Sequence, residues 1–261
     1  MMNHQPHSGQ VLVESGVFRK LDFLEGQLHD LMRGAAGMVP LTPGRDVTIL
    51  PIRELPPKKG LSTREGQARL LHDLASIELQ AMELGVRTLV EFPDAPDEFR
   101  AELCSVTMDE GRHLRLCLEG LQALGFPWGS FAAHNGLWQC VSSEDSLLDR
   151  IVIVHRYLEG SGLDASNTIL RRLGGVQARE ALRAVEVISA DEVGHVQFGS
   201  RWYHRLVVGD PLVDFHARLE RLFARIPRRL EPINRELRLR GGFTEGEVEV
   251  LQSVRGRLAG I

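Results

Sequence analysis

The sequences DEGRH at residues 109–113 and DEVGH at residues 191–195 repeat one pattern, Asp-Glu-x-x-His, within a chain of 261 residues. On a helix, residues i and i+3 share a face, so each copy directs a carboxylate and an imidazole toward one point. Glu110 with His113, and Glu192 with His195, can therefore each chelate a metal ion. The repeat predicts two helices that contribute to one metal site.

Two further glutamates complete such a site, because a dinuclear carboxylate centre in a four-helix bundle takes one glutamate from each remaining helix. The candidates are Glu78, in SIELQAMEL, and Glu159, in HRYLEGSG. Glu78 precedes the turn at Pro93 by about 15 residues and Glu110 follows it by about 17, which places both roughly 22–26 Å from the turn. The separations Glu78 to Glu110 and Glu159 to Glu192 also match to within one residue. We expect each glutamate to lie level with its Glu-x-x-His partner.

Hydrophobic periodicity predicts an all-α chain with four long helices. The first opens with Ser62 and Glu65, which have capping-box spacing, and ends at Pro93. The others are expected at 96–124, 143–159 and about 176–208. The segment between the second and third helices, 126–142, is long enough to run back along a bundle. These features predict a ferritin-like four-helix bundle with a long crossover between helices two and three.

The predicted domain organisation has three parts. Residues 1–60 form an N-terminal wrapping segment with a short amphipathic piece around VFRKLDFLEGQLHDLM. Residues 61–208 form the di-metal bundle, and residues 209–261 a C-terminal extension. We expect one or two helices in that extension, at about 211–229 and from Thr244, which has capping-box spacing to Glu247.

Glu159 is the one candidate with a geometric difficulty. If the third helix ends there, residues 160–175 must run nearly extended to match the descent of the fourth helix to Glu192. A continuing but distorted helix is the alternative. Gly160 and Gly162 would permit a π-type bulge, a feature common at functional sites.

Composition indicates a globular protein with no general affinity for nucleic acid or membranes. The chain carries a net charge of −4, with 43% hydrophobic and 25% charged residues. Its cysteines, Cys104, Cys117 and Cys140, are too few and too irregularly spaced for a disulfide framework or a thiolate zinc site. No signal peptide or membrane span is apparent, so we expect a cytoplasmic protein.

Two imidazoles among hard carboxylate oxygens suit iron or manganese. Asp109 and Asp191 each precede a ligand glutamate and could orient a histidine ring by accepting its N–H. His155 shares a face with Glu159, whereas His72 lies six residues before Glu78. For His155 we weigh a surface or outer-shell role against that of an extra metal ligand. We expect His72 to be a satisfied polar residue or an outer-shell partner.

The two motifs resemble the paired D-E-x-x-H of di-iron carboxylate oxygenases, a group that includes the soluble methane monooxygenase hydroxylase. Residues 60–206, with LLHDLASIELQAMEL, LEGSGLD and DEVGHVQFGSRW, resemble more closely the bacterial ferritin-like family catalogued as domain of unknown function 455. The resemblance implies the metal ligands Glu78, Glu110, His113, Glu159, Glu192 and His195. The sequence departs from that family's pattern at Ser76 and His155, where a His and a Pro commonly stand.

This resemblance, with the ligand set, implies a dioxygen-activating oxidoreductase with two iron ions, or a manganese–iron pair. It would hydroxylate or desaturate a small organic substrate, with Glu110 and Glu192 as the catalytic ligands and an external electron donor such as a reductase. Apolar residues near the ligands would shape access to the site: Leu79, Met82, Leu114, Ile188 and Val196. A homodimer is compatible with this interpretation.

Two other functions stay open at this point. A ferritin-like chain can instead handle iron, as a ferroxidase or peroxide-detoxifying protein, or can act as a metal-free interaction protein. The arginine-rich stretch 218–240 is normally a solvated or internally paired face, but it could dock an anionic partner such as RNA or a carrier protein.

Overall fold

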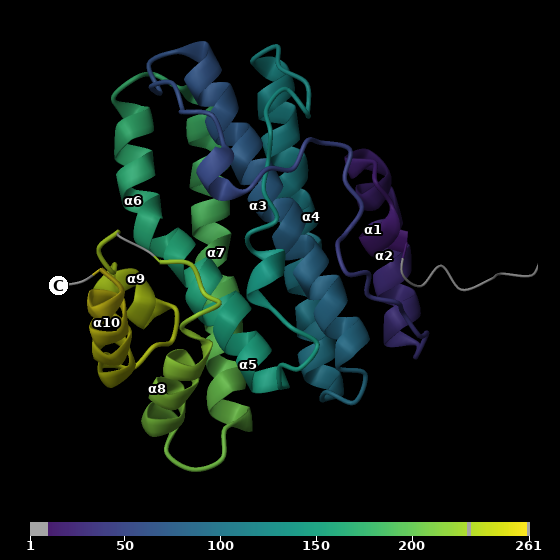
Figure 1. Cartoon of the computed structure of the whole chain (residues 1–261), viewed down its shortest axis with the longest axis vertical. Coiled ribbons are helices and arrows are strands. Elements are labelled where there is room, and N and C mark those ends of the chain that lie inside the picture. The colour runs from purple at the N-terminus through teal and green to yellow at the C-terminus, as the bar shows by residue number, and fades with distance from the viewer. Residues whose placement is uncertain (1–9, 229–230, 260–261) are drawn as a thin grey trace, which may run out of the picture. The chain divides into compact units, whose positions relative to one another are not determined.

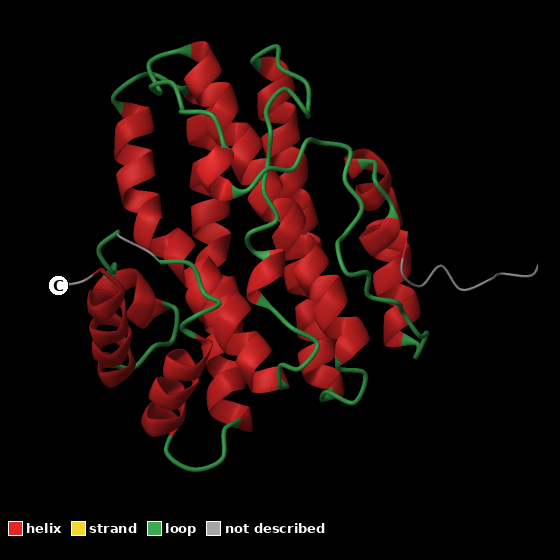
Figure 2. Ribbon diagram, viewed as in Figure 1, coloured by secondary structure: helices red, strands yellow, loops and turns green. Residues whose placement is uncertain are grey.

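A computed structural model describes residues 10–228 and 231–259 of the chain. Helices and connecting loops make up this part of the chain, and no β-strand occurs in it (Figure 2). An isolated bridge pairs Ile49 with Ala133. The all-α prediction is therefore confirmed. The chain divides into two compact units, the first through Trp138 and the second from Gln139, and each is described by itself.

The first unit is built on an antiparallel hairpin of two long helices, α3 (Arg64–Glu91) and α4 (Asp97–Ala123), which lie side by side in Figure 1. The Oγ1 of Thr63 caps α3 by accepting the N–H of Gly66 at 3.0 Å. The predicted cap, Ser62, is one residue too early. The helices otherwise begin and end where the prolines predicted, because proline cannot continue the preceding helix.

The two helices of the hairpin approach closely at Gly85. A Cβ added there would stand 2.2 Å from Oγ1 of Thr107 on α4. The Thr107 hydroxyl is itself fixed, donating to the carbonyl of Leu103 at 2.7 Å. A glycine is therefore required at this crossing.

The N-terminal segment packs on this hairpin through α1 (Gln10–Val13) and α2 (Val17–Met32), the second with the bounds of the predicted amphipathic stretch. Residues 33–63 follow with little regular structure beyond η1 (Ile52–Glu54). The buried carboxylate of Glu83 on α3 binds this segment: it accepts from Lys20 Nζ at 2.8 Å and from Arg45 Nη1 and Nη2 at 2.5 Å each. These ion pairs fix the wrapping segment to α3.

In the second unit, one long and distorted helical path runs antiparallel to α7 (Arg179–Leu206). It consists of α5 (Leu147–Ile151), the π-helix η3 (Val152–Glu159) and α6 (Gly160–Gly174). The predicted end of the third helix at Glu159 is therefore wrong, and the alternative of a continuing distorted helix is right. The π-helical part precedes Gly160 and Gly162. A turn with Gln177 at φ 54° leads into α7.

The C-terminal segment packs against η3, α6 and α7 through three helices. These are α8 (Pro211–Leu222), α9 (Arg235–Arg240), which the sequence did not predict, and α10 (Glu245–Ala259). The predicted capping box of α10 is confirmed: Thr244 N–H donates to Glu247 Oε2 at 2.8 Å and Glu247 N–H to Thr244 Oγ1 at 3.2 Å. In the part of the chain that the model describes, no helix combines the length and apolar character needed to cross a bilayer.

A fully buried arginine, Arg156 on η3, joins these helices. Its guanidinium lies over three aromatic rings, with the carbon 4.5 Å, 4.4 Å and 4.2 Å from the ring centroids of Tyr203, Phe215 and Phe243. It also pairs with Glu247 at 2.9 Å, where Glu247 further contacts His204 at 2.9 Å. Cation–π contacts and a buried ion pair thus hold the C-terminal segment to the π-helix.

Several arginines of the stretch 218–240 are paired with carboxylates of the same unit. The pairs are Arg218 and Arg221 with Asp149, Arg225 with Asp145, Arg235 with Glu245, and Arg238 with Asp164. This pairing corresponds to the internally paired face that we weighed against an anionic partner.

Gly85→Ala is expected to destabilise the chain by about 1–3 kcal/mol, because the new methyl group overpacks the α3–α4 crossing. Gly26→Ala, on an exposed face of α2 with open space around the added Cβ, is expected to be neutral or stabilising by up to about 1 kcal/mol. Urea unfolding of both variants measures the difference. Equal stabilities would contradict the close crossing.

Glu247→Gln is expected to lower the free energy of unfolding by about 3 kcal/mol at pH 7, because it leaves buried Arg156 without its carboxylate. Burial alone would raise the pKa of Glu247, but His204, Arg156 and the Thr244 backbone outweigh it and lower the pKa from 4.5 to about 2. The stabilisation is therefore present above pH 4.5 and is lost as the pH falls toward 2. The free energies of unfolding of the wild type and the variant should converge over that pH range. A constant difference would refute the stabilising role of the ionised Glu247.

Candidate metal centre

Three candidate ligands of the first unit meet at the middle of the α3–α4 hairpin. Glu78 lies 13 residues before the end of α3, and Glu110 lies 13 residues after the start of α4. Because the helices are antiparallel and each residue rises about 1.5 Å, the two carboxylates stand level. His113 follows one turn after Glu110 on the same face.

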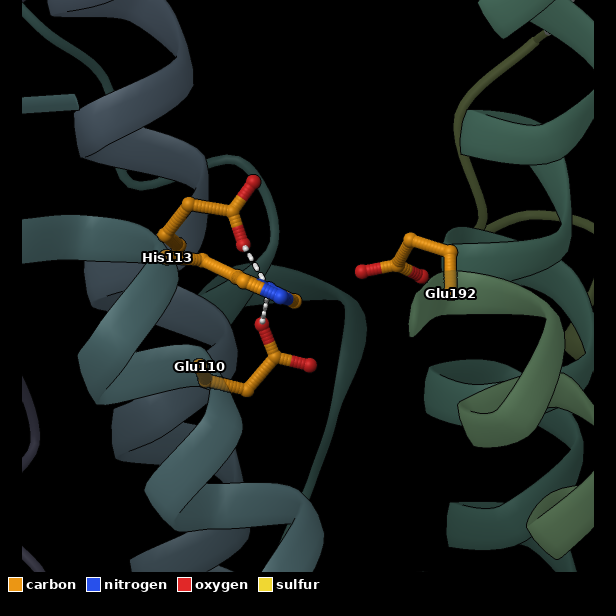
Figure 3. A group of neighbouring side chains, drawn as sticks. Glu110, His113 and Glu192 are labelled. Atoms are coloured by element: carbon orange, nitrogen blue, oxygen red, sulfur yellow. Dashed lines mark ion pairs between the residues drawn. The ribbon is translucent and has the colours of Figure 1, made fainter. Parts of the chain in front are cut away.

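The imidazole of His113 lies between the two carboxylates (Figure 3). Its Nδ1 is 3.6 Å from Glu78 Oε2 and 3.6 Å from Glu110 Oε2. One ligand atom from each of the three residues lies within 4.8 Å of the others, and all three residues are buried. The predicted grouping of Glu78, Glu110 and His113 is therefore present in the structure.

Charge balance in this group depends on the proton of His113. Burial would lower the pKa of His113, but the carboxylates of Glu110 and Glu78 outweigh it and raise the pKa to about 11. Without a metal, the two carboxylates thus favour the protonated form of the ring. A divalent ion bound there would take over the role of that proton, and the ring would have to release it.

The second unit holds a similar group on η3 and α7. Glu159 lies 15 residues before the end of α6, and Glu192 lies 13 residues after the start of α7. His195 Nδ1 is 3.6 Å from Glu192 Oε1, and a ligand atom of His195 lies within 4.8 Å of one from Glu159. Figure 3 also labels Glu192, whose carboxylate projects from α7. Glu159, the least certain candidate from sequence, thus joins His195.

An orphaned oxygen indicates that this second group fits a metal ion. Glu159 Oε2 is buried and has no hydrogen-bond partner among the described residues. A buried carboxylate oxygen without a donor is costly, and cation coordination is one of the few ways to satisfy it. Carboxylates and imidazoles without thiolates are the donor set of iron and manganese sites.

His155 orients Glu159 from within the same π-helix. Its Nδ1 lies 2.8 Å from Glu159 Oε1, and its ring meets the ring of Phe198 edge-on with centroids 4.9 Å apart. A Cβ added at Gly199 of α7 would stand 2.5 Å from the Cβ of His155. His155 thus contacts a candidate ligand, and its outer-shell role stays a prediction.

The other three outer-shell candidates occupy different surroundings. Asp109 pairs with Arg112 at 2.9 Å, with 42% of its side chain exposed, and Asp191 is half-buried on α7. Buried His72 stacks on Trp128 with centroids 4.5 Å apart, and its Nε2 accepts the N–H of Gly129 at 3.3 Å. Burial lowers the pKa of His72 to about 4, so its ring is neutral at pH 7. Its described contacts are with the 126–131 loop.

Cys117, which the sequence reading did not place at the site, lies one turn beyond His113 on α4. It is fully buried, and burial together with the charge of Glu78 raises the pKa of its thiol well above the usual value. The thiol therefore stays protonated beside the glutamate. The helical interval of four residues from His113 is the signal that could have revealed it.

The apolar residues expected near the ligands are all buried, namely Leu79, Met82, Leu114, Ile188 and Val196. Met82 lies close to Gly111, the residue after Glu110, since a Cβ at Gly111 would stand 3.6 Å from the Met82 sulfur. Val196 packs on the C-terminal segment, with Cγ1 2.6 Å from the Cβ position of Gly241.

The model of the family described as Protein of unknown function (DUF455) matches residues 15–249. The chain belongs to this family. A protein of Haemophilus influenzae, described only as uncharacterized, is 32% identical over 211 residues that cover 77% of this chain and 73% of the relative. No solved structure matches the chain. Family membership agrees with the resemblance over residues 60–206, and the matched region contains every candidate ligand.

His113→Ala is expected to weaken metal binding by more than about 100-fold, because it removes a direct ligand, whereas outer-shell changes cost roughly 10- to 100-fold. Glu119→Gln, an exposed carboxylate of the same helix, is the matched control and should bind as wild type. Elemental analysis after dialysis against Fe²⁺ or Mn²⁺ measures the metal content of each protein.

The same metal should raise the thermal midpoint of the wild type, since a ligand at 100 times its Kd stabilises by about 2.7 kcal/mol. The His113→Ala variant should gain less, and chelation should reverse the gain. An unchanged metal content in His113→Ala would remove this residue from the ligand set.

Proposed function

We propose that the two Glu/His groups together supply the ligands of a ferritin-like dinuclear metal centre that activates dioxygen. The observation that carries the proposal is duplication: each unit presents two glutamates and one histidine at level positions of an antiparallel helix pair. A single group of this kind would serve one ion. Two matched groups in one chain correspond to the ligand set of di-iron carboxylate proteins.

Iron, or a manganese–iron pair, is the metal content that the donor set favours. When bound, two reduced ions supply the redox equivalents and open positions that dioxygen chemistry requires. The reaction we propose consumes one dioxygen, two electrons from an external donor and two protons. It yields a hydroxylated or desaturated organic product together with water.

The protein's own groups bind and orient. Glu78, Glu110, Glu159 and Glu192 would balance the positive charge, and His113 and His195 complete the two ligand sets. His155 holds Glu159 at one oxygen through its 2.8 Å contact and leaves the other oxygen for coordination. Buried Met82 and Leu114 would keep water from the first group.

The proposal is tested by loading the protein with Fe²⁺ under argon and then admitting dioxygen. We expect two Fe²⁺ per chain and uptake of about one dioxygen per pair of ions. X-ray absorption should detect a metal–metal vector of about 3.5–4 Å, as in two-metal sites generally. The His195→Ala variant, from the second unit, should lose both the vector and the uptake.

Incubation with ¹⁸O₂, a reductant and a metabolite extract then separates the functions. A labelled small product supports an oxygenase. Oxidised iron retained as mineral in a large assembly would favour iron handling instead. An iron-loaded protein that is inert to dioxygen would refute both.

A further inference from the structure

A backbone carbonyl of the π-helix η3 is bound by an arginine side chain from the C-terminal segment. A π-helix bonds i to i+5 instead of i to i+4, so its junction with an α-helix displaces carbonyls from the regular ladder. Near the junction of η3 with α6, Arg156 O accepts from Arg238 Nη1 at 2.6 Å, and Tyr157 O accepts from Ser161 Oγ at 2.5 Å. Two successive carbonyls are thus bound by side chains.

Arg238, on α9, is fully buried and held in one orientation. Its Nε and Nη2 donate to the two oxygens of Asp164 at 3.1 Å and 2.7 Å, a bidentate pair. Asp164 is held in turn by Arg255 Nη1 at 2.7 Å and by the N–H of Asn234 at 2.9 Å. The guanidinium therefore points its remaining nitrogen, Nη1, at the π-helix.

Gly160 makes room for this contact. A Cβ added at Gly160 would stand 2.2 Å from Arg238 Nη1 and 2.6 Å from its Cζ, whereas a Cβ at Gly162 would meet nothing within 4 Å. Both glycines lie in the first turn of α6, where alanine would ordinarily favour the helix by about 1 kcal/mol. The glycine at 160 is thus matched to the arginine.

We propose that Arg238 is a positioning residue for Glu159. By binding the Arg156 carbonyl, Arg238 holds the π-helical register, and this register turns Glu159 toward His195. If the extra residue per turn were lost, one side of the junction would rotate by roughly 100° and shift by about 1.5 Å against the other. A carboxylate rotated that far no longer reaches its ion. The inference rests on the proposed dinuclear centre.

Five variants of the full chain test this assignment, and Arg238→Lys is the conservative one. Arg238→Gln removes the guanidinium group. Gly160→Ala keeps the arginine at 238, but its added Cβ displaces the guanidinium. Arg100→Gln is the first control: Arg100 is also buried and donates to three carbonyls, those of Leu31, Leu89 and Phe92, in the first unit. Gly162→Ala is the second control. Each protein is titrated with Co²⁺ under argon and followed by visible absorption, metal content and thermal unfolding.

Wild type and both controls are expected to bind two Co²⁺ per chain. In Arg238→Gln and Gly160→Ala the second ion should bind about 10- to 100-fold more weakly, and the affinity for the first ion should not change. The absorption change that accompanies the second step of the Co²⁺ titration should differ from that of the wild type. Arg238→Lys should recover part of the second step, because an ammonium group can still donate to the Arg156 carbonyl. General destabilisation cannot produce this selectivity if Arg100→Gln, as expected, lowers the stability and still binds both ions.

Two Co²⁺ bound with wild-type affinity and spectrum in Gly160→Ala would overturn the role of Arg238 and leave the dinuclear centre standing. Equal loss of the second ion in the controls would overturn it too. Fewer than two ions in the wild type would instead refute the dinuclear centre itself. If Arg238→Gln does not fold, Gly160→Ala decides, because the three atoms nearest to the added Cβ all belong to the Arg238 guanidinium.

Discussion

Buried charge in the middle of long helices is the constraint on which the rest of this structure depends. Glu78, Glu110 and His113 are at most 3% exposed, so each ionised group needs an opposite charge within reach. In the first unit that requirement explains why α3 and α4 are antiparallel, nearly equal in length and closely packed at Gly85. Helix length, register and packing all serve to place two carboxylates on either side of one imidazole.

Features set by neighbouring residues were predictable from the sequence. The ends of α3 and α4 follow from prolines, α2 from its apolar period, and the α10 cap from Thr244 and Glu247. The Glu-x-x-His groups belong to the same class, because three residues of helix suffice to align them. The cap at Thr63 shows the limit of such patterns, since two adjacent hydroxyl residues both fit and the backbone selects one.

Features that depend on distant residues were not predictable. The Arg156 carbonyl of the π-helix accepts a hydrogen bond from an arginine 82 residues away, and nothing in VIVHRYLE predicts that donor. The aromatic side chains that contact His72 likewise come from a separate loop, more than fifty residues downstream. The arginine-rich stretch shows an excess of positive charge in the sequence, but only the fold reveals which carboxylates pair with these arginines. Pairing partners across a chain are a property of topology, and a single sequence does not specify them.

The position of Arg238 has a consequence for the order of synthesis. Every candidate ligand has left the ribosome once the chain extends beyond His195, yet the residue that braces Glu159 emerges more than forty residues later. A nascent chain therefore carries the full set of donor groups before the π-helix has its lateral support. The ligands in α3 and α4 can assemble early, and those in η3 and α7 are completed only when the last helices arrive. If the proposed centre forms, its second ion would be bound only after the polypeptide is complete.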